Sequence, residues 1–405
     1  MRLLPDSTSA DARRLLLTRS LRGLGDGMVS VLLPSYLSHL GYTPFQVGAI
    51  VTGTLLGSAA LTLGVGLLGH RLALRRLLLG AAILMFLTGL GFAGVTSFVP
   101  LLFVAIVGTL NPSAGDVSVF LPTEQAVLAG AVAPEGRTTL FAWYNVAGSF
   151  AGALGALASG LPIALARRSG SSLVQAERSG FVLYAVLAVA AAFVYQKLSP
   201  AIESRQHAER PAPLARSRRI VLRLAALFCL DSFGGGFIVQ SLLALWLYRR
   251  FGLSVETAGS IFFLTGLLGA LSQLVAARLA ARIGLIETMV YTHLPANLLL
   301  IVAGLMPTAP LAVGCLLLRT TTSQMDVPAR QSFVMSVVPP EERAAASSVT
   351  NVPRSLAAAL SPLVAGALLE RTSFGWPLLA AGVLKAIYDL ALLANFRTES
   401  AEHGP

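Results

Sequence analysis

Four aspartates lie within or beside long apolar stretches of the chain, where carboxylates are rare: Asp26, Asp116, Asp231 and Asp326. An ionised carboxylate is unfavourable in apolar surroundings, so a buried one either takes up a proton or pairs with a cation. These four side chains are therefore candidates for binding and releasing protons. For Asp26 the alternative is an ion pair with Arg22, which precedes it by one helical turn.

Basic side chains stand in apolar stretches of the second half. Arg330 follows Asp326 by four residues, so the two can pair along one helix face. Arg319 lies about two turns before Asp326, on the same side of the predicted helix. Arg354 has no acid within four residues along the chain, so it can bridge to another helix or bind an anion. The candidate substrate contacts are Arg319, Arg354, Asn145, Asn351, Trp143, Tyr144 and Gln240.

Two further patterns concern the last third of the chain. Lys385 and Asp389 are four residues apart and are predicted to neutralise each other. His293 has no obvious Ser or Asp companion, which argues against hydrolytic chemistry. Met289 lies four residues before His293, but two ligands on one helix are weak evidence for a metal, so no metal site and no cofactor are predicted.

The composition identifies lipid as the surroundings of these groups. Of 405 residues, 55% are hydrophobic and 12% charged, against about 25% charged in soluble domains. A spanning helix needs about 20 apolar residues. The chain is thus predicted to be an all-α membrane protein with twelve transmembrane helices, near 23–40, 45–69, 75–96, 99–121, 139–164, 179–197, 221–248, 255–279, 285–306, 309–335, 343–369 and 374–396.

One stretch is written twice, 206 positions apart. It reads PTEQAVLAGAVAPEGRTTLFAWYNVAGS from Pro122 and PARQSFVMSVVPPEERAAASSVTNVPRS from Pro328. Internal repeats of this kind are typical of membrane proteins built from two like halves. We predict an N-terminal six-helix bundle over 1–198, a cytoplasmic basic linker over 199–219 and a C-terminal six-helix bundle over 220–405.

The repeat places Glu124 at the position of Arg330. Equivalent helices would then present opposite charges, so a Glu124–Arg330 bridge across the two halves is predicted as a gate. The alternative is that both residues simply lie at the cytoplasmic ends of their helices.

Cationic residues recur in short loops between apolar stretches, which is typical of membrane topology and not of a nucleic-acid surface. Their distribution predicts that both termini are cytoplasmic. Arg is strongly preferred over Lys, since Lys197 and Lys385 are the only lysines. This composition resembles that of GC-rich bacterial genomes, and we expect a monomer in a bacterial cytoplasmic membrane.

The chain resembles the major facilitator superfamily, whose members have two six-helix bundles joined by a cytoplasmic loop. The family motif Gly-x-x-x-Asp-Arg-x-Gly-Arg-Arg corresponds to GLLGHRLALRR, with Arg71 retained and His70 in place of the Asp. In the second half, ARLAARIGLI retains Arg282. The resemblance implies gating roles for Arg71 and Arg282, beside Glu124 and Arg330. The alternative is that the two arginines only end their helices.

A glycine-rich run, AGSFAGALGALASGLP, vaguely resembles the corresponding helix of proton-coupled efflux members. Small residues four apart also let two helix backbones approach closely, and general helix packing is the preferred interpretation.

These observations predict a secondary transporter that moves a small solute by alternating access, with proton-coupled efflux of an amphipathic compound as the leading hypothesis. The alternative is transport of an organic anion, a carboxylate or phosphate ester, by the Arg residues of the C-terminal half. A non-transporting membrane receptor or an intramembrane enzyme is the alternative of another class. The expected partners are the lipid bilayer, a small-molecule substrate and protons, with no nucleic acid.

Overall fold

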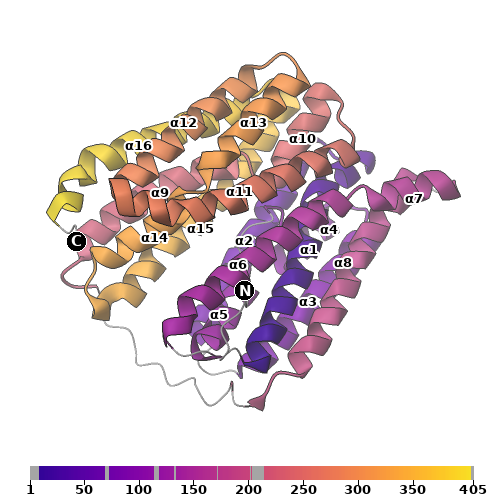
Figure 1. Ribbon diagram of the computed structural model, residues 1–405. Coiled ribbons are helices and arrows are strands. Elements are labelled where there is room, and N and C mark those ends of the chain that lie inside the picture. The colour runs from indigo at the N-terminus through magenta and orange to yellow at the C-terminus, as the bar shows by residue number, and fades with distance from the viewer. Residues whose placement is uncertain are drawn as a thin grey trace. The chain divides into compact units, whose positions relative to one another are not determined.

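The computed structural model describes residues 9–68, 73–113, 118–131, 134–170, 172–200, 202 and 214–402. Within these ranges the regular structure is helical (Figure 1). Nine segments of the described chain are long and apolar enough to cross a membrane. The predicted all-α membrane class is confirmed, while the count of twelve spans stays a prediction.

Contacts divide the chain into two compact units, Met1–Ala208 with Leu253–Phe263, and Glu209–Gly252 with Leu264–Pro405. The first unit contains α1 (Ala10–His39), α2 (Pro44–Leu68), α3 (Leu74–Gly94), α4 (Phe98–Val107), α5 (Phe120–Ala131), α6 (Pro134–Ala158), α7 (Leu161–Ser169) and α8 (Leu173–Gln196). The second contains α9 (Arg218–Gly236), α10 (Gln240–Phe251), α12 (Leu285–Leu305), α13 (Ala309–Ser323), α14 (Asp326–Ser336), η3 (Pro340–Glu342), α15 (Arg343–Arg371) and α16 (Trp376–Glu402). Helix α11 (Val255–Ile283) begins in the first unit and continues in the second.

Helix α1 begins well before the apolar stretch predicted from residue 23. Its start is fixed by Ser9, whose hydroxyl accepts a hydrogen bond from the backbone N–H of Ala12 at 3.2 Å, and Asp11 lies in the first turn. A capped, acidic first turn favours helix whether or not its side chains are apolar. The hydrophobic pattern therefore located the apolar part of this helix and missed its charged first turns.

Four predicted spans are each built from two helices. The stretches 99–121, 139–164, 221–248 and 309–335 become α4 and α5, α6 and α7, α9 and α10, and α13 and α14. Glycine and proline explain two of these breaks: Gly234–Gly236 end α9, and Pro162 stands in the first turn of α7. Each break brings helix ends, with their unpaired backbone groups, inside an apolar stretch.

The duplicated stretch folds into the same local structure twice. Helix α5 begins at Phe120 and α14 begins at Asp326, which is 206 positions later, the offset of the sequence repeat. The third residue of both helices is a proline, Pro122 or Pro328. Backbone N–H groups in the first turn of a helix have no intrahelical acceptor, so a proline at this position costs no hydrogen bond. The break before each short helix is therefore a property of the repeat.

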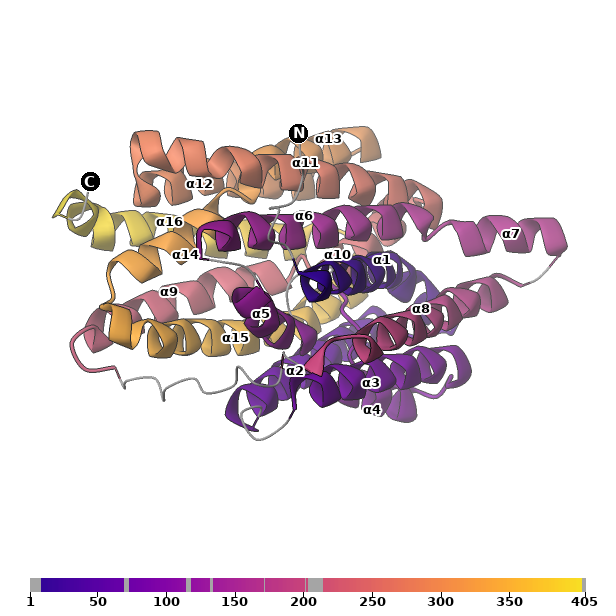
Figure 2. The same ribbon diagram turned by 60° about the horizontal axis from the view of Figure 1, so that its bottom comes forward.

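Glycines allow very close packing between helices within each unit. A Cβ placed on Gly27 of α1 would overlap the carbonyl oxygen of Gly152 of α6, and one on Gly155 would overlap that of Leu24. In the second unit a Cβ on Gly236 of α9 would overlap the carbonyl oxygen of Ala358 in α15. Both views show α1 beside α6 and α9 beside α15 (Figures 1 and 2). The packing interpretation of the glycine-rich run is confirmed.

Carboxylates hold the chain at both ends of the stretch between the two units. Asp11 accepts hydrogen bonds from the backbone N–H of Ser199 at 3.1 Å and from its hydroxyl at 2.5 Å. Glu342 accepts the hydroxyl of Ser217 and the backbone N–H groups of Arg216 at 2.9 Å and Ala215 at 3.1 Å. These donors lower the pKa of Glu342 from its ordinary value of 4.5 to about 2, so their stabilising effect is complete above the ordinary value and is lost progressively as the pH falls through about 2.

The glycine contacts predict a position-specific effect of a single methyl group. Gly27→Ala is expected to destabilise the protein by about 1–3 kcal/mol, because the new Cβ must push α1 away from α6. Gly80→Ala is the matched control, since a Cβ at Gly80 meets nothing within 4 Å. It should leave stability unchanged or raise it by up to about 1 kcal/mol through helix propensity. Thermal unfolding of the purified protein in detergent measures both, and equal effects would contradict the packing argument.

Candidate functional site

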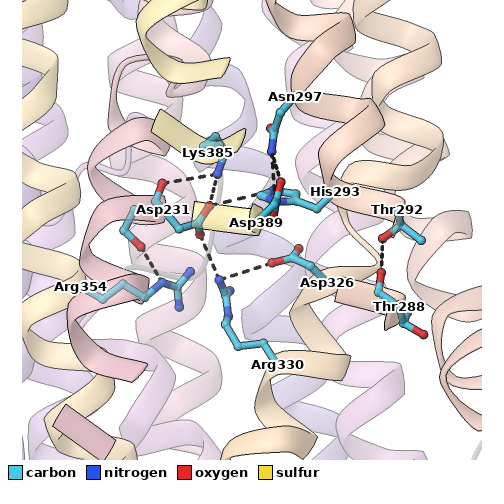
Figure 3. A network of polar contacts seen from close by, with 11 residues as sticks. Asp231, Thr288, Thr292, His293, Asn297, Asp326, Arg330, Arg354, Lys385 and Asp389 are labelled. Carbon is cyan, nitrogen blue, oxygen red and sulfur yellow. Dashed lines mark hydrogen bonds and ion pairs between the residues drawn. The ribbon is translucent and has the colours of Figure 1, made fainter. Parts of the chain in front are cut away.

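The second unit contains a buried network of charged side chains from α9, α12, α14 and α16 (Figure 3). Its centre is Asp231, which is 4% exposed. The Nζ of Lys385 donates to Oδ1 of Asp231 at 2.5 Å, and a guanidinium nitrogen of Arg330 donates to Oδ2 at 3.1 Å. The predicted Asp326–Arg330 pair is confirmed at 3.4 Å. Arg330 therefore joins two carboxylates, one on its own helix and one on α9.

A second part of the network is formed by α12 and α16. The Nδ1 of His293 lies 2.8 Å from Oδ1 of Asp389, and the amide of Asn297 donates to Oδ2 at 2.8 Å. The predicted Lys385–Asp389 pair is therefore wrong. The two side chains share a helix but are directed to different neighbours, Lys385 to α9 and Asp389 to α12. The expectation that His293 lacks an acidic companion is corrected as well.

Two more arginines approach this network. The Nε of Arg354 in α15 donates to the hydroxyl of Ser232 at 2.7 Å, next to Asp231 in the chain. The Nε of Arg319 in α13 is buried and has no hydrogen-bond partner among the described residues, although the charges of Asp231 and Asp326 act on its guanidinium. Four cations, Arg319, Arg330, Arg354 and Lys385, thus meet three carboxylates, Asp231, Asp326 and Asp389. One positive charge is left over when His293 is neutral.

The first unit contains a smaller network centred on Glu124 of α5, which is fully buried. Its carboxylate pairs with the guanidinium of Arg22 in α1. It also accepts the hydroxyls of Thr18 at 2.8 Å, of Tyr195 at 2.6 Å and of Tyr144. The guanidinium of Arg22 lies over the ring of Phe120, 4.2 Å from its centroid. This carboxylate is saturated with donors, as a charge at this depth requires.

The two networks are related by the internal repeat with their signs exchanged. Gly27 and Gly236 make equivalent close contacts and are 209 positions apart, and the same offset relates Arg22 to Asp231. Glu124 and Arg330 are related by 206. The first unit therefore pairs a base on α1 with an acid on α5, and the second an acid on α9 with a base on α14.

Glu124 and Arg330 each have an opposite charge within their own unit, on the first helix of that half. The predicted Glu124–Arg330 bridge, which would join the two units, stays a prediction.

Asp26 lies one turn beyond Arg22 in α1 and is 7% exposed. The side chains of Asn111 and Tyr184 are at hydrogen-bonding reach of its carboxylate, and the charges of Arg22 and Arg19 act on it. Its environment thus combines the two alternatives left open by the sequence. Arg19 and Tyr195 are not predicted from the sequence. The spacing of Arg19, Arg22 and Asp26 along one helix face could have indicated Arg19, whereas no local sequence pattern indicates Tyr195.

The remaining predicted residues are spread over both units. Asn145 in α6 and Asn351 in α15 are exposed, at positions equivalent under the repeat, while Trp143 and Gln240 are half-buried. Tyr144 is buried against Glu124, and Arg282 is exposed in the last turn of α11. Asp116 and Arg71 lie outside the described residues. The described part of the chain contains no group of three or more His, Cys, Asp or Glu side chains placed to hold a metal ion.

Comparison with known proteins gives consistent matches over most of the chain. A family model described as Major Facilitator Superfamily matches residues 15–360. An uncharacterized membrane protein of Saccharomyces cerevisiae is 25% identical over 425 residues, covering 96% of this chain and 94% of that protein. The multidrug efflux protein YfmO of Bacillus subtilis is 26% identical over 376 residues, covering 91% and 89%. The structure of the nucleoside transporter NupG shares the fold, with a TM-score of 0.73 at 15% identity, covering 96% of this chain and 100% of that one.

The saturated pair in the first unit predicts strong coupling between Arg22 and Glu124. Glu124→Gln should destabilise the protein by about 3–5 kcal/mol, because it leaves the buried charge of Arg22 uncompensated. Adding Arg22→Met should recover much of that loss, since the double variant buries no net charge. A double-mutant cycle of unfolding free energies in detergent measures the coupling. Additive effects of the two changes would show that the ion pair contributes nothing of its own.

Proposed function

The chain belongs to the Major Facilitator Superfamily, and on that premise we propose that this membrane transporter is a proton-coupled secondary transporter that exports an amphipathic organic compound. The observation that carries the proposal is the pair of buried charge networks, one in each half of a duplicated chain. Structural charges are costly in apolar helices, and ionisable groups kept there commonly mark ion and substrate pathways. In transporters built from repeats, the halves move against each other around a central site.

Proton coupling is supported first by Asp26. Its carboxylate is buried in α1 beside neutral hydrogen-bonding groups and forms no salt bridge with another described residue. A carboxylate in this situation can exist in either protonation state with its neighbours still satisfied. Asp231 and Asp326 form ion pairs with Arg330 or Lys385. Because these cations favour the ionised carboxylates, the two aspartates are weaker proton-carrier candidates than Asp26. Asp116 remains a candidate from sequence alone.

Export of an amphipathic compound is supported by the match to a multidrug efflux protein over most of both chains. Contacts to such a compound are proposed for Trp143, Asn145, Asn351 and Gln240, which are not buried within their own units. Tyr144 is a weaker candidate than the sequence suggested, because its hydroxyl is engaged by Glu124.

The remaining proposals concern gating and location. Glu124 and Arg330 are proposed to hold the first helix of each half to its partner helix, and Arg282 to act at the end of α11. Arg71 keeps the gating role that the family motif implies. We propose a monomer in a bacterial cytoplasmic membrane. The distribution of basic residues supports the proposal that both termini lie on the cytoplasmic side.

The proposal predicts solute flux driven by a pH gradient in proteoliposomes. Asp26→Asn should abolish the dependence of flux on the gradient and leave the protein folded, because it removes the titrating group and keeps its shape. Asp26→Glu, which retains a carboxylate, is the matched control and should keep part of the coupling. Unchanged coupling in Asp26→Asn would exclude Asp26 from the mechanism. Solute binding with no flux in the unmodified protein would favour a receptor over a transporter.

Transport of an organic anion is a second candidate function. It is favoured by the surplus positive charge of the second unit, and by Arg319, whose buried Nε has no hydrogen-bond partner within the described chain. A carboxylate or phosphate ester would supply the missing negative charge, and a guanidinium binds either group through two parallel hydrogen bonds. An amphipathic compound that carries one carboxylate satisfies both candidates.

The anion candidate predicts inhibition of flux by carboxylated or phosphorylated solutes. Arg354→Gln should raise the inhibitory concentration at least tenfold, because it removes one of the two arginines that carry the surplus charge. Arg219→Gln, a change of the same type at an exposed position, is the control and should have no effect. Equal inhibition of both variants would contradict an anion site at Arg354.

A further inference from the structure

His293 is buried in α12, 3% exposed, between two carboxylates on different helices. Its Nδ1 lies 2.8 Å from Oδ1 of Asp389 in α16, and its Nε2 lies 4.0 Å from Oδ1 of Asp231 in α9. A neutral imidazole has one N–H donor and one acceptor, whereas the protonated ring has two donors. A ring with a carboxylate facing each nitrogen is therefore arranged for the protonated form.

The other charged and titratable groups around this histidine come from α13, α14 and α16, which pack against α12, and from α9, whose Asp231 side chain reaches the ring. They are Asp389, Lys385 and Tyr388 of α16, Asp326 and Arg330 of α14, Arg319 of α13, and Asp231 of α9. Tyr388 meets the imidazole edge-on, with the ring centroids 6.1 Å apart.

The charges that are directly connected balance only when the histidine is protonated. Three carboxylates, Asp231, Asp326 and Asp389, meet the two permanent cations Arg330 and Lys385. A protonated His293 supplies the third positive charge and makes the connected network neutral. A neutral His293 leaves this connected part, counted without Arg319 and Arg354, with one negative charge over, which is unfavourable at this depth.

We propose that His293 is a proton-binding residue, and that its protonation releases one of the two guanidinium groups of Arg319 and Arg354 to bind an anion. The proposal rests on the anion candidate described above. When His293 loses its proton, the surplus negative charge must be compensated from nearby. Arg354 is anchored on Ser232 beside Asp231, and the charges of Asp231 and Asp326 act on both arginines. The guanidinium of one arginine then compensates the carboxylates of the network and is not available to bind an anion.

The consequence is that a proton and an anion bind together in the second unit, which is the coupling of a symporter and distinguishes the anion candidate from proton-driven export. Each favours the other, because the proton frees a guanidinium and the anion then neutralises it. By linkage, the anion must raise the affinity of His293 for its proton by the same factor.

The proton site is tested by NMR titration of the imidazole signals of the full-length protein in lipid nanodiscs. The chain has five histidines, and the signal of His293 is identified by its loss in His293→Gln. The titration is followed from about pH 5 to about pH 9, a range that brackets the titration of ordinary histidines. In Asp389→Asn the midpoint should fall by about 1–3 pH units, because an opposite charge in contact is removed. The signal of His39, which is paired with Glu177, is the internal control and should not move.

A second variant covers the case in which Asp389→Asn does not fold. Asn297 lies 3.2 Å from Nδ1 of the imidazole, so Asn297→Asp adds a carboxylate beside the ring and should raise the midpoint. A His293 signal that stays in one protonation state across this range, or a midpoint that neither change moves, would overturn the proton site.

The link to the anion is tested in the same titration. Arg354→Gln and Arg319→Gln should each raise the midpoint, because they remove a competing cation, and the exposed Arg219→Gln should not. Benzoate, used as a simple monocarboxylate probe, should raise the midpoint in the unmodified protein and lose this effect in Arg354→Gln.

A midpoint that is insensitive to both arginines and to benzoate would overturn the link. None of these measurements requires flux, so a titrating His293 in a protein that moves no solute would exclude the transport proposal and leave the proton site standing.

Discussion

A charge buried among apolar helices must find its opposite within the same bundle, and this constraint shapes both halves of the protein. Glu124 is held by Arg22, and Asp231 by Arg330 and Lys385. In each case the partners come from different helices, so the ion pair fixes how those helices meet. Removing one partner would leave a bare charge in an environment with no water to replace it.

The exchange of signs between the two halves gives them different properties. In the first unit the carboxylate of Glu124 is surrounded by four donors, so this ion pair has no capacity left to bind a ligand. The second has gained acids and bases on α12, α13, α15 and α16, and they do not cancel. Both units thus have a central ion pair at equivalent positions of the repeat. The first unit adds Asp26, the proposed proton carrier, and the second adds the groups proposed to bind a proton and an anion.

The helix packing makes these networks possible. Close contacts such as Gly27 with Gly152 bring α1 against α6, and Gly236 with Ala358 brings α9 against α15. Side chains of moderate length can then reach from one helix to the next. The chain also breaks before α5 and before α14, so Glu124 and Arg330 lie on short helices that begin at equivalent positions of the repeat. Larger residues at the glycine positions would separate α1 from α6 and α9 from α15, and with α15 the hydrogen bond of Arg354 to Ser232 would lengthen.

The sequence by itself determined the membrane class, the duplication, the family resemblance and most of the helices, since these follow from the amount and spacing of apolar residues. It also determined the Asp326–Arg330 pair, because both residues lie on one helix at a fixed spacing. Only the tertiary structure decided that Lys385 is paired with Asp231, that Asp389 is paired with His293, and that Glu124 is paired with Arg22. Each of these contacts joins residues between 96 and 154 positions apart. Sequence spacing specifies neighbours only along one helix, and the choice among several opposite charges at the same depth depends on which helices pack together.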